Sequence, residues 1–128
     1  MIDPETERDC FALLDRFMAA LNAGDAAAMD ACMHFPSIRL AEGRMAIYEA
    51  PGQNPMDLFE RLRREDGWSH SRWDDRVVVQ AGPNKAHVKV AYSRFRADGS
   101  LIGAYESLYI LTKDESGWGI AVRSSFGP

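Results

Sequence analysis

The sequence predicts an α+β fold in which three helices pack on the concave face of a curved antiparallel sheet. Apolar residues recur at helical spacing in the first half of the chain, whereas the second half alternates apolar and polar residues in long runs. Short turns separate these runs, and such short connections join antiparallel neighbours. Helices early and strands late, within 128 residues, indicate a single α+β domain over residues 1–128.

Helical signals are clearest at the start of the chain. Asp3 can cap a helix whose first residue is Pro4, and Gly24 is expected to end that helix in a left-handed conformation. Asp25 can cap a second, alanine-rich helix, which is expected to pack closely against the first. The buried stripe of the first helix is expected to consist of Phe11, Leu14, Met18 and Leu21, widened by Leu13 and Phe17.

The middle of the chain predicts a small hairpin and a third helix. The second helix should run to about Met33 and be broken by residues 34–36. Residues 37–40 and 45–49 are expected to form the two strands of the hairpin. The pair Asn54-Pro55 can start the third helix. Its buried stripe is expected to contain Met56, Phe59 and Leu62, helped by Leu58.

Four further strands are expected over residues 73–81, 85–96, 101–113 and 118–126. With a two-residue turn at 98–99, Arg96 lies opposite Leu101. Tyr92 then lies opposite Tyr105. In this register one face of the strand pair carries Ala86, Val88, Val90, Tyr92 and Arg94 with Tyr105, Ser107 and Tyr109.

The composition argues against several classes of protein. A net charge of −4 disfavours nucleic acid or anionic membrane as a partner. No apolar run approaches the length of a membrane span and the N-terminus is too polar for a signal peptide, so we expect a cytoplasmic protein. Cys10 and Cys32 are expected to be free, buried thiols. The three histidines lack metal-ligand spacing, so neither a metal nor a cofactor is expected.

Three short segments carry a family resemblance. Residues 17–25 (FMAALNAGD), 34–45 (HFPSIRLAEGRM) and 116–125 (SGWGIAVRSS) resemble the nuclear transport factor 2-like superfamily, which includes SnoaL-like polyketide cyclases and ketosteroid isomerases. The resemblance implies a cone-shaped α+β barrel with a pocket for a small, fairly apolar molecule at its wide end. The chain has no tyrosine in its first helix and no carboxylate in residues 34–40, so ketosteroid isomerase activity is not expected.

Several residues could carry chemistry in such a pocket. His34 or His70 could move protons near neutral pH. For His34 the alternative is a bond to the end of the second helix. Arg94 could hold a substrate carboxylate or enolate, or it could extend its charged end into water. The expected pocket residues are Tyr48, Trp73, Tyr92, Arg94, Tyr105 and Arg123, although core packing is the alternative for Trp73 and Tyr105.

Two functions remain open on the sequence. The first is a SnoaL-like protein with a pocket for a small apolar or carboxylate-bearing molecule. Such a protein could also be a cofactor-independent isomerase, cyclase or dehydratase that uses acid–base chemistry. The alternative is a non-catalytic ligand-binding or dimerisation domain. Residues 108–111 are apolar on both sides of their strand, so the outer sheet face is expected to be covered by a second copy in a homodimer. A mixed, wet outer face is the other possibility.

Overall fold

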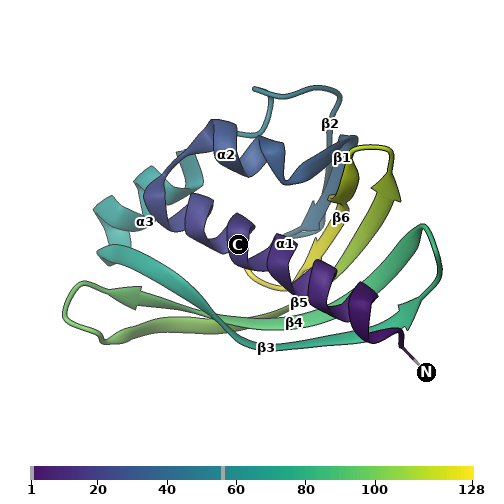
Figure 1. Cartoon of the computed structure of the whole chain (residues 1–128). Helices are drawn as coiled ribbons and strands as arrows, with labels where there is room; N and C mark the ends of the chain where they lie inside the picture. Colours follow the sequence, from purple (N-terminus) through teal and green to yellow (C-terminus); the bar gives the residue numbers. More distant parts are fainter. Residues whose placement is uncertain (1, 56) are drawn as a thin grey trace.

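The computed structural model describes residues 2–55 and 57–128, and these residues form three helices and six strands (Figure 1). The strands make one curved, unclosed sheet in the order β2-β1-β6-β5-β4-β3. The helices lie on its concave side. The predicted α+β class is therefore confirmed. The elements are α1 (Pro4–Ala23), α2 (Ala26–Ala31), β1 (Met33–Ala41), β2 (Arg44–Tyr48), α3 (Asp57–Asp66), β3 (Trp68–Ala81), β4 (Lys85–Arg96), β5 (Leu101–Asp114) and β6 (Gly117–Ser125).

One strand pair departs from the expected antiparallel sheet. β1 and β6 run parallel, with Arg39 opposite Arg123, so the sheet is mixed. The other neighbouring strands are antiparallel. β1 and β6 are separated in the chain by α3 and four strands, and no tight turn sets their relative direction. A reading of turns alone therefore could not predict this pair.

The register of β4 and β5 is confirmed over most of its length, with Tyr92 opposite Tyr105. Near the turn, a bulge places Phe95 opposite Leu101, where Arg96 was expected. The connection is a three-residue loop rather than a two-residue turn, because the amide of Arg96 donates to the carbonyl of Ser100 at 2.9 Å. Gly99, at φ 86°, supplies the left-handed residue that such loops require.

The observed element boundaries differ most from the predicted ones where the pairing between strands is irregular. β1 begins at Met33, four residues earlier than expected, and α2 correspondingly ends at Ala31. Pro36 lies in the irregular stretch between the paired residues Met33 and Ile38, where a residue without an amide hydrogen costs no ladder bond. β3 starts at Trp68 instead of residue 73, while β2 and β6 each shift by one residue. Met56, expected in the buried stripe of α3, lies outside the described residues.

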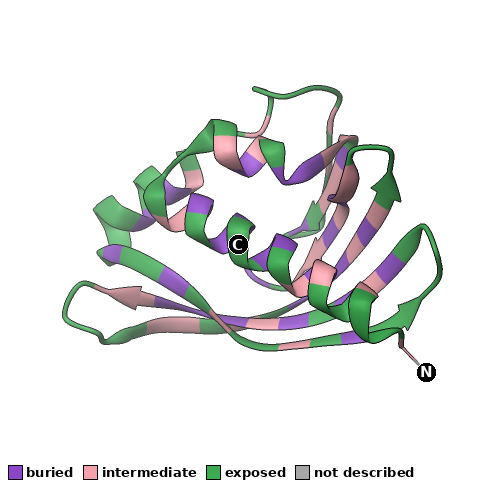
Figure 2. Ribbon diagram, viewed as in Figure 1, coloured by how far each residue is buried: buried purple, intermediate pink, exposed green. Residues whose placement is uncertain are grey.

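The main core lies between α1 and the concave face of the sheet (Figure 2). Leu13, Leu14 and Phe17 of α1 are almost fully buried, as predicted. Cys10 and Cys32 are buried and free, which confirms the expectation for both thiols. Burial raises the pKa of Cys10 to about 11, so this thiol stays protonated at neutral pH. The sheet side of the core includes Ala86, Val88, Val90, Tyr109, Leu111 and Ile120.

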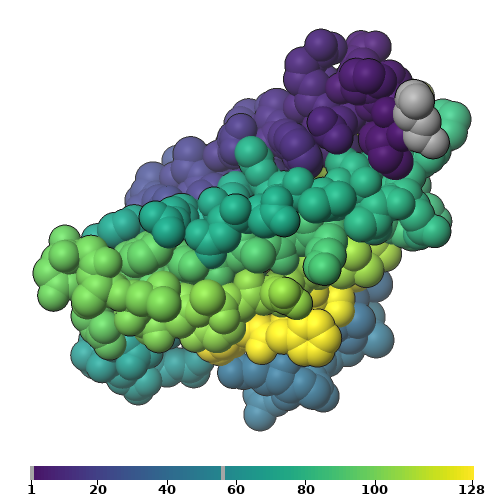
Figure 3. Space-filling model, turned by 90° about the horizontal axis from the view of Figure 1, so that it is seen from below, coloured from purple at the N-terminus to yellow at the C-terminus, as the bar shows by residue number. Residues whose placement is uncertain are grey.

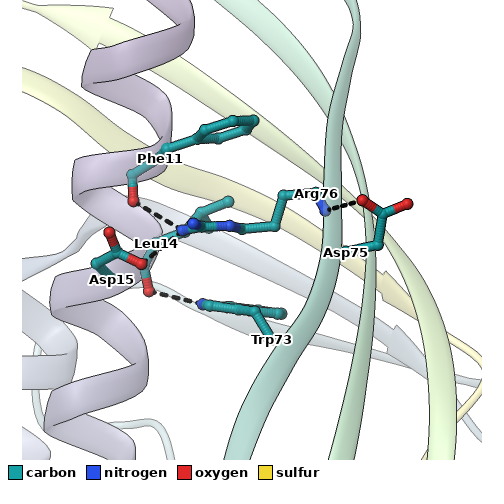
Figure 4. Close-up of polar contacts among 6 residues, drawn as sticks. All are labelled: Phe11, Leu14, Asp15, Trp73, Asp75 and Arg76. Atoms are coloured by element: carbon teal, nitrogen blue, oxygen red, sulfur yellow. Dashed lines mark hydrogen bonds and ion pairs between the residues drawn. The ribbon is translucent and has the colours of Figure 1, made fainter.

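Polar contacts anchor α1 to the edge strand β3 (Figure 4). Arg76 Nη1 donates to the carbonyl of Phe11 at 3.1 Å and lies 2.6 Å from Asp15 Oδ1. One turn further along, Trp73 Nε1 donates to the carbonyl of Leu14 at 3.0 Å. These contacts hold the helix at a defined height above the sheet and leave its buried stripe facing inward.

Asn22 anchors the C-terminal end of α1 to the same strand. Its side-chain nitrogen donates to the carbonyl of Ser71, and its side-chain oxygen accepts from the amide of Ser71, both at 2.8 Å. Edge strands carry unpaired backbone groups that invite pairing with other chains, and Asn22 satisfies two of them. The helix then ends at Gly24, whose φ of 65° is the predicted left-handed cap.

Within the described residues, no helix has the length and apolar character that crossing a bilayer requires.

We predict that Asn22→Ala lowers the free energy of unfolding by about 1–3 kcal/mol, because it leaves the partly buried Ser71 amide and carbonyl without their partners. Urea denaturation followed by circular dichroism measures this change. The control is Asn84→Ala, which removes an exposed turn side chain and should stay within about 0.5 kcal/mol of the parent. Equal effects of the two substitutions would show that the Asn22 contact contributes nothing specific.

Candidate functional site

A cavity of about 50 Å³ lies between the concave face of the sheet and helices α1 and α3. The helices contribute apolar side chains, among them Phe17 and Phe59. The sheet contributes the polar part of the lining. Four of the six pocket residues expected from the sequence are in this lining: Trp73, Tyr92, Arg94 and Arg123.

A second hollow of about 160 Å³ adjoins the cavity and shares Arg39 and Arg123 with it. It is lined by the β1–β2 hairpin, the segment before α3, the start of α3 and the C-terminal residue Pro128. It contains the predicted residue Tyr48, and its lining includes the carboxylates Glu42 and Asp57 as well as Arg61. Both hollows are far smaller than the roughly 300–1,000 Å³ of sites for drug-sized ligands. The geometry therefore suits a molecule of few heavy atoms.

Arg94 lies inside the protein. Its residue is 4% exposed, so the side chain does not extend into water, as one interpretation of the sequence allowed. Its guanidinium carbon lies 5.6 Å from the ring centre of Tyr92 and 5.1 Å from that of Tyr105. Nη2 donates to the carbonyl of Pro128 at 2.5 Å, whereas Nη1 is buried without a hydrogen-bond partner among the described residues.

Tyr105 does not line the cavity but supports Arg94 from the side. Its ring packs 5.6 Å from the ring of Tyr92. It also covers the backbone of Gly103, which lies opposite Arg94 in the sheet. A Cβ atom at position 103 would collide with the Tyr105 ring. The missing side chain therefore lets the tyrosine fold back beside the guanidinium group.

Arg123 is the second buried guanidinium group, 7% exposed, on β6. Its Nε and Nη2 atoms are buried without hydrogen-bond partners among the described residues. The guanidinium carbon lies 5.8 Å from the ring centre of Phe17. Burial lowers the pKa of Arg123, but a guanidinium stays charged in proteins, so this shift reflects the cost of burying the charge.

Tyr109 lies directly opposite Arg123 in the sheet and also lines the cavity. Burial raises the pKa of Tyr109 to about 12, and the charge of Arg123 opposes that rise only in part. The hydroxyl is therefore protonated at neutral pH and available as a hydrogen-bond donor. It cannot serve as a base under those conditions.

Neither buried arginine pairs with an aspartate or glutamate side chain among the described residues. The carboxylates with basic partners lie elsewhere: Asp74 beside Arg72, Asp15 beside Arg76, and Asp114 3.4 Å from His34 Nε2. An uncompensated buried charge costs several kcal/mol, of which each aromatic contact offsets about 0.5–2 kcal/mol. The cavity is thus electrostatically suited to an anion.

Hydroxyl groups on the sheet complete the lining. Ser125 Oγ accepts a hydrogen bond from Ser107 Oγ at 2.8 Å and lies 3.1 Å from the Tyr92 hydroxyl. The amide of Gly127 also donates to Ser125 Oγ, at 3.1 Å. A Cβ atom at Gly127 would lie 2.6 Å from the Tyr92 hydroxyl, so a glycine is required where the chain passes this ring.

Ser125 and Arg39 were not predicted as site residues. Strand alternation could have identified Ser125, because it lies two positions after Arg123 on the same strand and so faces the same side. Arg39 alternates in the same way with the buried residues Ser37 and Ala41. However, only the parallel pairing of β1 with β6 brings Arg39 beside Arg123.

The structure does not bring His34 or His70 to the cavity. His34 lies near the β5–β6 turn, where Nδ1 is 2.7 Å from Thr112 Oγ1 and Nε2 is 3.4 Å from Asp114 Oδ2. His70 is exposed and stacks on Phe95 with ring centres 5.3 Å apart. Proton transfer by either histidine would therefore take place outside the arginine-lined cavity.

The described part of the chain contains no cluster of side chains that could bind a metal ion. No group of three or more histidine, cysteine, aspartate or glutamate side chains gathers there in a metal-binding arrangement. The cavity lining contains three arginines, Arg39, Arg94 and Arg123, and no carboxylate or imidazole among the described residues.

Comparisons with known proteins agree on one fold family. A family model described as "NTF2-like protein (DUF6841)" matches residues 6–125. An NTF2-like protein with a cystatin-like fold from Novosphingobium aromaticivorans superposes with a TM-score of 0.78 at 17% identity, covering 95% of this chain and 81% of that one. A ketosteroid isomerase-like protein from Erwinia carotovora atroseptica gives a TM-score of 0.64 at 21% identity, with coverages of 98% and 100%.

A third solved structure is that of a complex. It comes from Catenulispora acidiphila, was solved in complex with S-DNPA, and superposes with a TM-score of 0.75 at 12% identity, covering 97% of this chain and 94% of that one. At these identities the likenesses show the fold alone. Among curated proteins, none matches the sequence significantly.

We predict that Arg123→Met raises the free energy of unfolding of the ligand-free protein by about 1–4 kcal/mol, because a flexible apolar side chain replaces an uncompensated buried charge. Urea denaturation measures the change. The matched control is Arg8→Met, on an exposed position of α1, which should change stability by less than about 0.5 kcal/mol. A loss of stability in Arg123→Met would mean that the guanidinium group is compensated within the protein.

Proposed function

The chain belongs to the NTF2-like family described as DUF6841, and from this premise we propose that it is a SnoaL-like pocket protein that binds a small carboxylate-bearing molecule under α1. The membership confirms the resemblance carried by residues 17–25 and 116–125. The observation that carries the proposal is the pair of buried guanidinium groups of Arg94 and Arg123, which retain unpartnered nitrogens and have no aspartate or glutamate side chain beside them among the described residues.

The chemistry of the lining supports this ligand class. A guanidinium group presents parallel N–H donors that match the two oxygens of a carboxylate, and such charge-assisted bonds are about twice as strong as neutral ones. Phe17, Phe59 and Trp73 supply apolar contacts for the remainder of the molecule. The S-DNPA complex of the Catenulispora acidiphila protein is a precedent for a small molecule on this fold.

Binding is better supported than acid–base catalysis. The described lining contains no carboxylate or histidine, and the Tyr109 hydroxyl is protonated at neutral pH. Isomerisation, cyclisation or dehydration without a cofactor is the second candidate, favoured by the placement of Tyr92 and Arg94, which could stabilise a developing negative charge. In that case the proton-transfer group would have to come from the substrate, from water, or from Glu42 or Asp57 in the adjoining hollow.

We also propose that the outer sheet face forms a homodimer. An apolar row crosses the sheet from Met45 through Leu40 and past Ser124 to Leu108. The outer-face patch consists of Leu40, Met45, Ile47, Leu108 and Phe126, of which Phe126 is 88% exposed. Figure 3 shows this face, with the C-terminal residues (yellow) beside β5 (green) and the β1–β2 hairpin (blue) beyond them. A second copy offers the same apolar area in a two-fold arrangement.

Benzoate and benzamide form a matched pair of probes for carboxylate binding, since they share a ring and differ in charge. We expect benzoate to bind at least about tenfold more tightly in isothermal titration calorimetry and to raise the melting temperature, because each charge-assisted hydrogen bond contributes about 1.5–3 kcal/mol. Benzoate has a single carboxylate, so Arg94→Met or Arg123→Met, whichever removes the arginine that binds it, should abolish most of this preference.

The controls for the benzoate experiment are His34→Ala and His70→Ala, which leave the cavity lining intact and should retain benzoate binding. Equal affinity for benzamide would contradict the proposal. Loss of binding in either histidine variant would instead indicate that the site involves that histidine and would favour the acid–base candidate.

Sedimentation velocity tests the homodimer. The parent is expected to sediment as a dimer, and Ile47→Lys combined with Leu108→Lys should give a monomer, because two like charges would enter the apolar interface of each copy. Val79→Lys places the same charge on β3, outside the outer-face patch, and should leave the dimer unchanged. A monomeric parent at about 100 μM, well above the Kd of a stable interface, would rule the homodimer out.

A further inference from the structure

The two buried arginines approach the cavity from different parts of the sheet. Arg94 lies on β4 opposite Gly103, and Arg123 lies on β6 opposite Tyr109. These partner residues are six positions apart on β5, the strand between them. At about 3.4 Å per residue, this separates the two arginine backbones by about 20 Å along the strand direction. The two arginines are therefore anchored at opposite ends of the stretch of sheet that lines the cavity.

Arg123 offers more buried, unpartnered nitrogen atoms to a ligand than Arg94 does. Its unpartnered atoms, Nε and Nη2, belong to the same edge of the guanidinium plane, and their N–H bonds are parallel. This edge matches a carboxylate in two-point contact. The protonated hydroxyl of Tyr109 lies on the neighbouring strand, and Arg39 adds positive charge from the other side.

At Arg94 one nitrogen is already engaged. Nη2 donates to the main-chain oxygen of Pro128, whereas Nη1 is buried without a partner among the described residues and can donate to a ligand. The rings of Tyr92 and Tyr105 pack against the guanidinium group. The Arg94 end therefore offers one buried, unpartnered nitrogen to an acidic group, whereas the Arg123 end offers two.

We propose that the ligand is a small dianion with two acidic groups on a short scaffold, one bound by Arg123 and the other by Arg94. This inference rests on the proposed function and deepens it. A monoanion would leave one of the two guanidinium groups with buried N–H donors that have no partner, and each unsatisfied buried donor costs about 1–3 kcal/mol. A dianion satisfies both. The about 50 Å³ cavity and the adjoining hollow of about 160 Å³ limit the scaffold to a few atoms.

The test compares mono- and dicarboxylates of equal length on the full chain. Butyrate with succinate, pentanoate with glutarate, and inorganic phosphate are titrated by calorimetry at constant ionic strength. In at least one pair the dicarboxylate should bind about tenfold or more tightly than the monocarboxylate, since the second acidic group gains a charge-assisted bond. Phosphate, which carries its charge on one centre, should bind more weakly than the best dicarboxylate.

Arginine-to-lysine variants separate the two ends. Arg123→Lys keeps the charge but loses the parallel N–H pair, so the dicarboxylate should bind about tenfold or more weakly. Arg94→Lys keeps the positive charge at the end where only one nitrogen is buried and unpartnered, and it should lose less. Arg94→Met and Arg123→Met should each reduce the dicarboxylate to the affinity of the matched monocarboxylate. His70→Ala, remote from the cavity, should have no effect, and circular dichroism checks that each variant is folded.

Three results would overturn the inference. Equal affinity within every matched pair would leave carboxylate binding intact but exclude the dianion. Phosphate binding as tight as the best dicarboxylate would indicate a ligand with one doubly charged centre. Failure of benzoate and all the carboxylates to bind would overturn the proposed function together with this inference. The first and third results are distinguished by whether any monocarboxylate binds.

Discussion

The burial of two guanidinium groups without aspartate or glutamate partners among the described residues is the constraint on which the site depends. Arg94 and Arg123 sit on the concave face of the sheet, where the backbone ladder fixes their strands and aromatic rings flank their guanidinium groups. Aromatic packing offsets only part of the desolvation cost. A more stable protein would be obtained with apolar residues at both positions. The arrangement is therefore better explained by binding than by folding, since sites commonly trade stability for function.

The helical cover makes that burial possible. α1 is held to the edge strand β3 at successive levels by Arg76, Trp73 and the backbone of Ser71, so its position over the sheet is fixed by directional bonds as well as by apolar packing. Phe17 then lies over Arg123 and closes the cavity from above. The same contacts satisfy backbone groups on a strand edge that would otherwise be open to pairing with another chain. The same residues thus pack α1 on the sheet, protect the edge of β3 and form the wall of the site.

Membership of the NTF2-like family establishes the architecture and leaves the chemistry to the side chains. The described lining of this cavity is cationic and aromatic and lacks a carboxylate or histidine. Such a lining holds and orients an anion but offers no group that titrates near neutral pH. His34 and His70, which are the side chains best suited to proton transfer, lie at other places on the fold. Function is therefore inferred from charge and geometry at this site, rather than from the activities of proteins with the same fold.

Local patterns in the sequence determined the limits of α1 and its Gly24 cap, the extent of β4, and the face that carries Tyr92 and Arg94. Capping, helical periodicity and strand alternation involve residues that are near in sequence, so these features can be predicted from a single sequence. Only the tertiary structure decided whether Arg94 was buried or solvated, that β1 runs parallel to β6, and that Arg39 joins Arg123 in the lining. It also placed the histidines outside the cavity. These outcomes depend on which distant strands pair and how the sheet curves, and no short-range pattern encodes such contacts.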